Sequence, residues 1–498
     1  MQEQHSPGTA RPPSYLDATA PLALMAVLVA GAVALFGLEA TAGPMQVAMM
    51  LTAMVTACIL LKNGHSWEDI AAAGRTGVSS VVSAIFILFA VGALIGTWNV
   101  SGTIPTMVYY GMQFLQPDWF YAATAIICAA ISLGIGSSWT TAGTVGVGLV
   151  GLASLMGLSP VVAAGAVVSG AYVGDKLSPL SETTILAAQL TGSDLYAHLH
   201  AQMATSIPAV LIAVAGFTLV GLLDGTSGAS DQIIVSELSA LGDLYWITPL
   251  NLLPLVFLVA LSFLKVPPSL AIMASALLAG LMATILQPDI VLRFANARDL
   301  PAWAGSVKAV WLAISSGYEA HSGMPVVDDL ISRGGMDSML LTVWLIIGAV
   351  VMGTLLDEFG LLSKLMTPIL VRARTTGRLI ATTAGTALGL NIVAGDQYVS
   401  LVLPSRLFSA EFRSRGLAST NLSRAVSDAG TVTSPLVPWN SCGAYMAAVL
   451  GVPTLLYLPF CFFNLASPVL TVLYGFCGFK IARLTAKPKP AAAGGLST

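Results

Sequence analysis

The sequence predicts an all-α polytopic membrane protein made of two inverted repeats of about five crossings each, with re-entrant hairpins and broken helices. Three observations lead to this fold class. Of the 498 residues, 56% are hydrophobic and only 9% carry a charge. Several apolar stretches are long enough to cross a bilayer, and landmarks of the first half recur in the second. Because an ordinary soluble domain has roughly 25% charged residues, the composition excludes a soluble fold.

The apolar stretches have the roughly 17 to 25 residues that a membrane-spanning helix needs. They are uniformly apolar and contain Gly and Ala, which is typical of packed membrane helices, whereas barrel strands alternate polar and apolar residues. We therefore expect helices in these stretches: Pro21–Leu38, Met45–Leu61, Val78–Trp98, Met203–Leu223, Thr248–Leu264, Pro268–Ile285, Met339–Leu356 and Pro453–Phe476.

The first 20 residues lack the charged start, apolar middle and cleavage site of a signal peptide, and they contain Pro7, Pro12 and Pro13. We expect residues 1–20 to be a disordered cytoplasmic tail and residues 480–498 to be a cytoplasmic tail. Five cysteines lie in apolar segments without a CxxC pair, which indicates helix packing rather than metal binding: Cys58, Cys128, Cys442, Cys461 and Cys477.

Loop charges predict the orientation, because basic residues gather on the cytoplasmic side. The segment from Asp224 to Asp243 has acidic residues and no Lys or Arg, so we place it outside. The segment from Lys364 to Arg378 is strongly basic, so we place it inside. With the basic residues near Lys62 and Lys480, this predicts a multi-pass protein of the cell inner membrane with both termini in the cytoplasm.

An internal duplication is indicated by landmarks that recur in the same order after about 255 to 258 residues. The pairs are Gly92–Thr97 with Gly348–Thr354, Leu133–Ile135 with Leu388–Leu390, and Ser178–Leu180 with Ser434–Leu436. The segment Asn99–Pro117 has no basic residue, whereas its counterpart Asp357–Arg378 is basic. The two halves are therefore expected to cross the membrane in opposite directions.

This duplication gives the expected organisation of the chain. Repeat 1 covers residues 21–223, with scaffold helices in 21–98 and a hairpin and broken helix in 119–190. An extracytoplasmic linker, 224–247, leads to repeat 2 in 248–479, with scaffold helices in 248–356 and a hairpin and broken helix in 379–450. Because Leu379–Leu407 is too short for two crossings of roughly 20 residues each, it is predicted to be re-entrant, as is Trp119–Leu152.

Four polar regions interrupt the apolar pattern at symmetric places: residues 136–143 and 174–184 in the first half, and 391–400 and 427–441 in the second. Their side-chain oxygens are the predicted ion- or substrate-binding groups. They belong to Ser137, Ser138, Thr140, Thr141, Asp175, Ser178, Ser181, Glu182, Thr183, Thr184, Asn391, Asp396, Gln397, Asp428, Thr433, Ser434, Asn440 and Ser441.

Physical chemistry explains why such regions suit a cation. Pro179, Pro435 and Pro438 break helices, and non-helical backbone survives at membrane depth only where protein or a water-filled cavity satisfies it. The freed carbonyls and the Ser, Thr and Asn oxygens form the hard oxygen shell that Na+ needs. An acidic residue at a helix centre costs roughly 2.5 to 3.5 kcal/mol on insertion scales. The presence of four such residues in these regions, Asp175, Glu182, Asp396 and Asp428, therefore indicates function.

Structural alternatives remain for several of these residues. Asp175 and Lys176 are adjacent and can form an ion pair, and Asp428 can cap the broken helix. The hydroxyls of residues 137–141 can bond back to their own helix carbonyls. We expect His198 and His200 to be solvated in a cytoplasmic loop.

The segment Gly174–Thr184 resembles the signature of NhaC-type Na+/H+ antiporters, which usually reads GD-x-x-SP-x-SDTT. Glu182 stands where that family more often has Asp. Gly317–Tyr318 and Ile331–Met336 are also similar to the family, and the resemblance runs from about Leu22 to Phe479. It implies elevator-type transport by a mobile domain that contains the hairpins, a scaffold of the first helices of each half, and often a homodimer.

The hypothesis is that the protein exchanges Na+ for protons by alternating access, with Asp175 and Asp396 as proton-coupling candidates at one midplane site. Na+ and H+ are then the transported ions, no cofactor is expected, and the partners are the lipid bilayer and small solutes, not nucleic acid. The alternative is Na+- or H+-coupled transport of organic carboxylates (malate, lactate) or amino acids, with residues 136–143 holding a substrate carboxylate at a helix N-terminus. Because HExxH, GxSxG and nucleotide-binding motifs are lacking, we expect no enzyme and no catalytic residue.

Overall fold

The computed structural model describes residues 10–224, 241–296, 299–320, 328 and 331–484. Within these residues the regular structure is helical, apart from one isolated bridge between Leu417 and Arg483. Seven of the described helices are long and apolar enough to cross a membrane, or up to eight if one bent pair forms a further span. The prediction of an all-α polytopic membrane protein is confirmed at this level.

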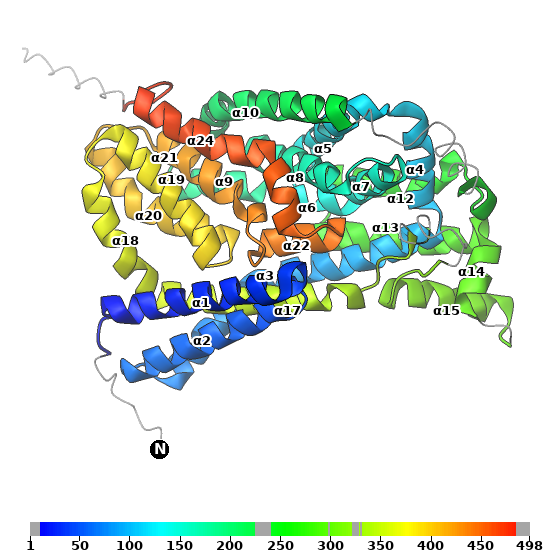
Figure 1. Ribbon diagram of the computed structural model, residues 1–498, viewed down its shortest axis with the longest axis horizontal. Helices are drawn as coiled ribbons and strands as arrows, with labels where there is room; N and C mark the ends of the chain where they lie inside the picture. Colours follow the sequence, from blue (N-terminus) through cyan, green and yellow to red (C-terminus); the bar gives the residue numbers. More distant parts are fainter. Residues whose placement is uncertain (1–9, 225–240, 297–298, 321–327, 329–330, 485–498) are drawn as a thin grey trace, which may run out of the picture.

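One group of helices lies along the lower part of Figure 1. It consists of α1 (Tyr15–Phe36), α2 (Pro44–Lys62), α3 (Trp67–Val100), α13 (Pro268–Leu286) and α17 (Leu340–Glu358). In this group α2 packs against α1 and α17, and α3 packs against α13 and α17. At the right of the figure, α3 also contacts α15 (Ala302–Ser315), which packs on α14 (Pro288–Ala295).

A second group lies in the upper part of Figure 1. It contains α5 (Phe120–Ile135), α8 (Pro160–Leu177), α10 (Leu195–Asp224), α19 (Thr376–Val393) and α24 (Phe462–Cys477). Here α8 packs along α5, and α24 lies against α10 and α19. Glycines allow the close fit of α8 on α5, since a side chain at Gly174 would collide with Ser132. The helices α18 (Leu361–Arg372), α20 (Gln397–Ser414) and α21 (Ser419–Val426) lie to the left.

Four helical segments are interrupted near their middle. After α5 the chain turns at Gly136 into α6 (Ser138–Thr141), a π-helical turn and α7 (Val147–Leu155). After α8 it continues into α9 (Glu182–Thr191), and α19 is followed by a turn and α20. In the fourth segment, α21 runs into the π-helical turn η7 (Ser427–Thr431), η8 (Ser434–Leu436) and α22 (Ser441–Leu450). These interruptions coincide with the four polar regions of the sequence.

Two predicted spans differ from single helices. Residues 248–264 form a 3-10 turn, η5 (Pro249–Leu252), followed by α12 (Leu253–Phe263). The predicted helix Pro453–Phe476 is wrong, because the chain passes through α23 (Thr454–Tyr457) and η9 (Leu458–Phe460) before α24 begins. The axis from α22 to α23–η9 bends by 93°.

The predicted tails are partly ordered. Ser14 starts α1 with a capping box, in which its hydroxyl accepts from the Asp17 N–H at 3.1 Å and its N–H donates to the Asp17 carboxylate at 3.0 Å. Residues 15–20 are therefore helical rather than disordered, and residues 1–9 lie outside the described part. In the C-terminal tail, residues 480–484 pack on the turn between α20 and α21. Residues 485–498, and 225–240 of the predicted linker, also lie outside it.

Candidate functional site

A cavity of about 500 Å³ lies where the interrupted helices meet. Its walls come from α6, α9, the N-terminal end of α20, the start of α22, and from α3 and the α12–α13 turn. Ten predicted site residues line it: Ser137, Ser138, Thr140, Asp175, Ser181, Glu182, Thr183, Asp396, Gln397 and Ser441. The structure thus brings the carboxyl groups of Asp175 and Asp396, from the two halves of the chain, to one cavity.

The Asp175 carboxylate is held by the first residue of α6. One oxygen accepts the Ser138 backbone N–H at 2.8 Å, and the other accepts the Ser138 hydroxyl at 2.5 Å. The first amides of a helix lack a partner within that helix, and its N-terminal end is positive, so a carboxylate is stabilised there. Asp175 is only 7% exposed. The two hydrogen bonds from Ser138 therefore replace hydrogen bonds that water would otherwise donate to the carboxylate.

The backbone carbonyl of Asp175 lies at the end of α8 and accepts hydrogen bonds from three hydroxyls. It accepts from Ser181 at 3.1 Å, from Thr183 at 2.9 Å and from Thr184 at 2.7 Å. The last carbonyls of a helix have no partner within it, and the break that follows brings these hydroxyls into reach. The start of α9 is therefore attached to the end of α8 at Asp175.

Asp396 is the N-cap of α20. Its Oδ1 accepts the backbone N–H of Tyr398 at 2.8 Å and of Val399 at 3.1 Å. The preceding Gly395 has a positive φ of 63°, a conformation that glycine adopts without strain. Helix α17 approaches this turn at Gly353, where a side chain would collide with the Ala394 backbone. Asp396 is thus fixed by its own helix and lies next to α17.

Tyr398 joins the two halves of the chain at the cavity. Its hydroxyl donates to Glu182 Oε2 at 3.1 Å. Glu182 is exposed, whereas Asp175 and Asp396 are buried. Lys265, in the α12–α13 turn, also lines this cavity and is exposed. The deeper part of the site therefore has two carboxyl groups, and the exposed residues of its lining carry one further acid and one base.

A second set of predicted residues packs behind the cavity without lining it. Asn391 Nδ2 donates to the Gly430 carbonyl at 2.6 Å and to Thr433 Oγ1 at 3.0 Å. Asn440 Nδ2 donates to Asn391 Oδ1 at 3.2 Å, and Asn440 Oδ1 caps α22 by accepting the Cys442 N–H at 3.0 Å. These amides connect α19, the η7–η8 segment and α22.

Several other predicted residues bond locally or elsewhere. The Thr141 hydroxyl donates to the Ser137 carbonyl at 2.9 Å, and the Ser434 hydroxyl donates to the Thr431 carbonyl at 2.8 Å. Ser178 Oγ accepts the Leu180 N–H at 3.3 Å. Asp428 lies outside the cavity lining and forms an ion pair with Lys176. The carboxylate partner of Lys176 is thus Asp428 and not its neighbour Asp175.

The expectation for His198 is wrong. His198 lies in α10 and is fully buried, with its Nδ1 2.7 Å from Ser423 Oγ. His200, two residues later, is exposed. The two side chains leave the helix in different directions, and only one of them meets a packed neighbour, α21.

Comparison with known proteins identifies the family. The profile described as "Na+/H+ antiporter family" matches residues 17–189 and 170–479. The chain belongs to the Na+/H+ antiporter family. This confirms the resemblance found in the sequence.

Three relatives of this family member carry different names. The "Na(+)/H(+) antiporter NhaC" of Alkalihalophilus pseudofirmus is 35% identical over 84% of this chain and 87% of the relative. The "Arginine/ornithine antiporter ArcD" of Halobacterium salinarum is 33% identical over 94% and 93% of the two chains. The "Malate-2H(+)/Na(+)-lactate antiporter" of Bacillus subtilis is 34% identical over 87% and 90%.

In this antiporter-family chain several residues of the cavity lining are not among the predicted site residues. Ser80 and Ser83 line it from α3, and Trp139, Tyr398, Cys442 and Lys265 also contribute. Ser80 and Ser83 lie three positions apart on a helix, which puts them on one face and is a signal that an apolar stretch can conceal. Trp139 stacks on Tyr445 with ring centroids 4.0 Å apart, and the Tyr445 hydroxyl donates to the Trp139 carbonyl at 2.8 Å.

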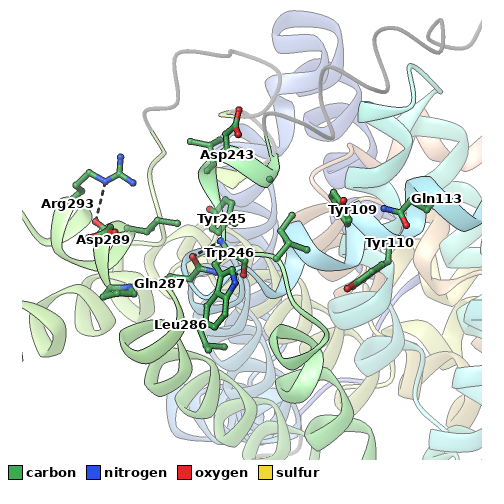
Figure 2. Close-up of a pocket in the computed structure, with 15 residues that line it drawn as sticks. Tyr109, Tyr110, Gln113, Asp243, Tyr245, Trp246, Leu286, Gln287, Asp289 and Arg293 are labelled. Atoms are coloured by element: carbon green, nitrogen blue, oxygen red, sulfur yellow. Dashed lines mark hydrogen bonds between the residues drawn. The ribbon is translucent and has the colours of Figure 1, made fainter.

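A larger hollow, of about 750 Å³, contains none of the predicted residues. Figure 2 shows Tyr109, Tyr110 and Gln113 of α4 (Thr103–Phe114) on one side and Asp289 and Arg293 of α14 on the other. Between them, the buried Gln287 accepts the Trp246 N–H at 3.1 Å and donates to the Trp246 carbonyl at 3.0 Å. In this hollow the Gln287 side chain therefore holds the backbone of the segment before η5. Asp175 and Asp396 do not line it.

Proposed function

We propose that this protein exchanges Na+ for protons by alternating access at the cavity that contains Asp175 and Asp396. The observation that carries the proposal is that two buried carboxyl groups, one from each half of the chain, line the same cavity. A carboxylate binds either Na+ or H+, so competition for these oxygens is enough to couple the two ions. The hydroxyls of Ser138, Ser181 and Thr183 lie in the same lining and supply further oxygen ligands.

The hydrogen bonds favour a cation over an organic carboxylate. A substrate carboxylate held at a helix N-terminus needs free amides there. The Ser138 N–H of α6 is taken by Asp175, and the Tyr398 and Val399 N–H groups of α20 are taken by Asp396. The first residue of α9 is Glu182, whose charge opposes an anion. The protein's own carboxylates thus bind the helix N-terminal amides that would have to hold a substrate carboxylate if the cargo were an organic anion.

A second candidate function is Na+- or H+-coupled transport of an organic solute. The size of the cavity favours it, since about 500 Å³ lies in the range of small-molecule pockets. Relatives named for arginine/ornithine and for malate and lactate exchange are about as similar as the relative named for Na+/H+ exchange. The lining contains three acidic residues and one Lys, so a cationic amino acid fits it better than an organic carboxylate does.

The proposed mechanism includes two inverted repeats and elevator-type movement of the hairpins against the scaffold. Supporting this, the turns before α6 and α20 each contain a glycine with positive φ, Gly136 at 80° and Gly395 at 63°. We also propose a homodimer in the cell inner membrane with both termini in the cytoplasm. Cysteine labelling from each side tests the inversion, and it is refuted if residues 99–117 and 357–378 label from the same side.

The function is tested with purified protein in proteoliposomes, by recording internal pH after a Na+ gradient is imposed. Asp175→Asn and Asp396→Asn are each expected to lower the exchange rate by at least about tenfold. Asp289→Asn is the matched control, because Asp289 is an exposed acid that lies in the other hollow. Malate, lactate and arginine are then added in turn. Exchange that appears only with one of these solutes refutes Na+/H+ exchange and supports the second candidate.

A further inference from the structure

An ion pair inside the protein lies beside the cavity without lining it. Lys176 and Asp428 contact each other, and both side chains are fully buried. The Thr471 hydroxyl donates to the Asp428 carboxylate. The Lys176 ammonium lies 3.4 Å from the hydroxyls of Thr205 and Ser467. The Lys176 side chain of α8 therefore contacts η7, α10 and α24 at the same time.

Lys176 directly follows Asp175 in the last turn of α8, and their side chains lead to different places. Asp175 lines the cavity and bonds to Ser138, whereas Lys176 is buried against η7, α10 and α24. Successive side chains of a helix are about 100° apart around its axis. A rotation of this turn that releases Lys176 therefore also moves the Asp175 carboxylate relative to Ser138.

We propose that the Lys176–Asp428 pair is a positioning device that holds the Asp175 carboxylate in the cavity, an inference that rests on the proposed exchange at Asp175. Lys176 and Asp428 are then positioning residues and do not bind the transported ion. The pair also explains why both charges are kept in the interior, since a buried charge is tolerated when it is paired and hydrogen-bonded.

The surroundings of Asp428 make the two partners unequal. Arg424, which is 2% exposed, lies four residues before Asp428 in the preceding helix α21, about one helical turn away. Asp428 therefore keeps a cation nearby when Lys176 is replaced. When Asp428 is replaced, the Lys176 ammonium loses its carboxylate while it stays buried. Asp428→Asn is thus expected to be more damaging than Lys176→Met.

The test compares Lys176→Met, Asp428→Asn and the double variant in proteoliposomes, with melting temperature, the KM for Na+ and the pH profile of exchange as readouts. We expect Lys176→Met to raise the KM for Na+ by about tenfold. The double variant, which removes both charges of the pair, is expected to recover part of the melting temperature that Asp428→Asn loses, while its KM stays raised and its pH profile stays displaced.

Two results would overturn the proposal. A double variant with the wild-type KM and pH profile would show that the pair stabilises the fold and nothing more. A lower KM for Na+ in Lys176→Met would show that Asp428 is an ion ligand that Lys176 normally occupies. Asp175→Asn is measured alongside, and wild-type exchange in that variant would contradict the proposed function itself rather than the role of the pair.

Discussion

Both oxygens of the Asp175 carboxylate accept hydrogen bonds from Ser138, one from its backbone N–H and one from its hydroxyl. The two residues belong to different interrupted segments, since Asp175 lies in the last turn of α8 and Ser138 begins α6. The contact therefore joins two segments in the cavity lining and sets the direction in which the carboxylate faces. A movement of either segment changes the environment of the group on which the proposed exchange depends.

Ser138→Ala is expected to lower the exchange rate by about tenfold, because a hydrogen bond to a charged group contributes about 1.5–3 kcal/mol. The backbone N–H remains, so the carboxylate keeps one of its two donors. Ser138→Thr is the matched control, since it keeps a hydroxyl at the same position. Rates are measured from Na+-driven pH changes in proteoliposomes, and equal rates in the Ala and Thr variants would contradict the role of the hydroxyl.

Gly136→Ala is expected to reduce both stability and exchange. Gly136 has a positive φ of 80°, and an added Cβ would lie 2.8 Å from the backbone and side chain of Leu180. The left-handed conformation alone costs a non-glycine residue about 1–2 kcal/mol. Gly389→Ala in α19 is the control, because nothing lies within 4 Å of its added Cβ. Thermal unfolding in detergent measures the difference, and two equal melting temperatures would refute the expectation.

The long helices could be predicted from the sequence because hydropathy sums over many residues and tolerates local error. The break before α24 could not, although Pro459 marks it. Proline alone does not predict a break in this chain, since Pro208 lies inside α10 and Pro468 lies inside α24. Which proline ends a helix depends on the neighbouring helices that satisfy the freed backbone groups.

The same distinction applies to the site. That Asp175 and Asp396 line a cavity could be predicted, because acidic residues are rare in apolar segments and indicate a polar surrounding. The partner of Asp428 could not, since Lys176 is far away in the sequence and meets it only through the packing of α8 on η7. Adjacent charges, such as Asp175 and Lys176, are the pair that a sequence suggests first, but neighbours on a helix face different directions.

Cys442 is only 1% exposed in this structure, so its thiol is expected to react when the cavity opens during exchange, and Na+ is expected to protect it. It lines the cavity next to Gln397, whose Oε1 lies 3.4 Å from its sulfur. In a Cys58→Ala/Cys477→Ala background, which removes the two exposed cysteines, a small cationic methanethiosulfonate reagent should inactivate exchange. Na+ should slow the inactivation by several-fold if the ion binds in this cavity. Cys442→Ala should be insensitive to the reagent, and inactivation at the same rate with and without Na+ would argue against ion binding there.

The C-terminal segment is expected to stabilise α21, which leads into Asp428. Asn421 donates from Nδ2 to the Ala482 carbonyl at 2.6 Å, and its Oδ1 accepts the Ala482 N–H at 3.0 Å. Arg424 donates to the Lys480 carbonyl at 3.0 Å, and the Leu484 N–H donates to the Gly416 carbonyl at 2.8 Å. A chain that ends at Phe479 loses all of these bonds, whereas one that ends at Leu484 keeps them.

Each such hydrogen bond contributes about 0.5–1.5 kcal/mol net, so the shorter chain is expected to have a melting temperature lower by at least about 2–4 °C. Ala482→Pro, which removes one donor to Asn421 in the full-length chain, should cause a smaller shift in the same direction. Thermal unfolding of the two truncated proteins and of this variant in detergent checks the order. If the chain ending at Leu484 unfolds at the same temperature as the one ending at Phe479, the segment does not support α21. Because Arg424 lies one helical turn before Asp428 and loses the Lys480 carbonyl in the shorter chain, this chain is further expected to show a raised KM for Na+, the direction expected for Lys176→Met.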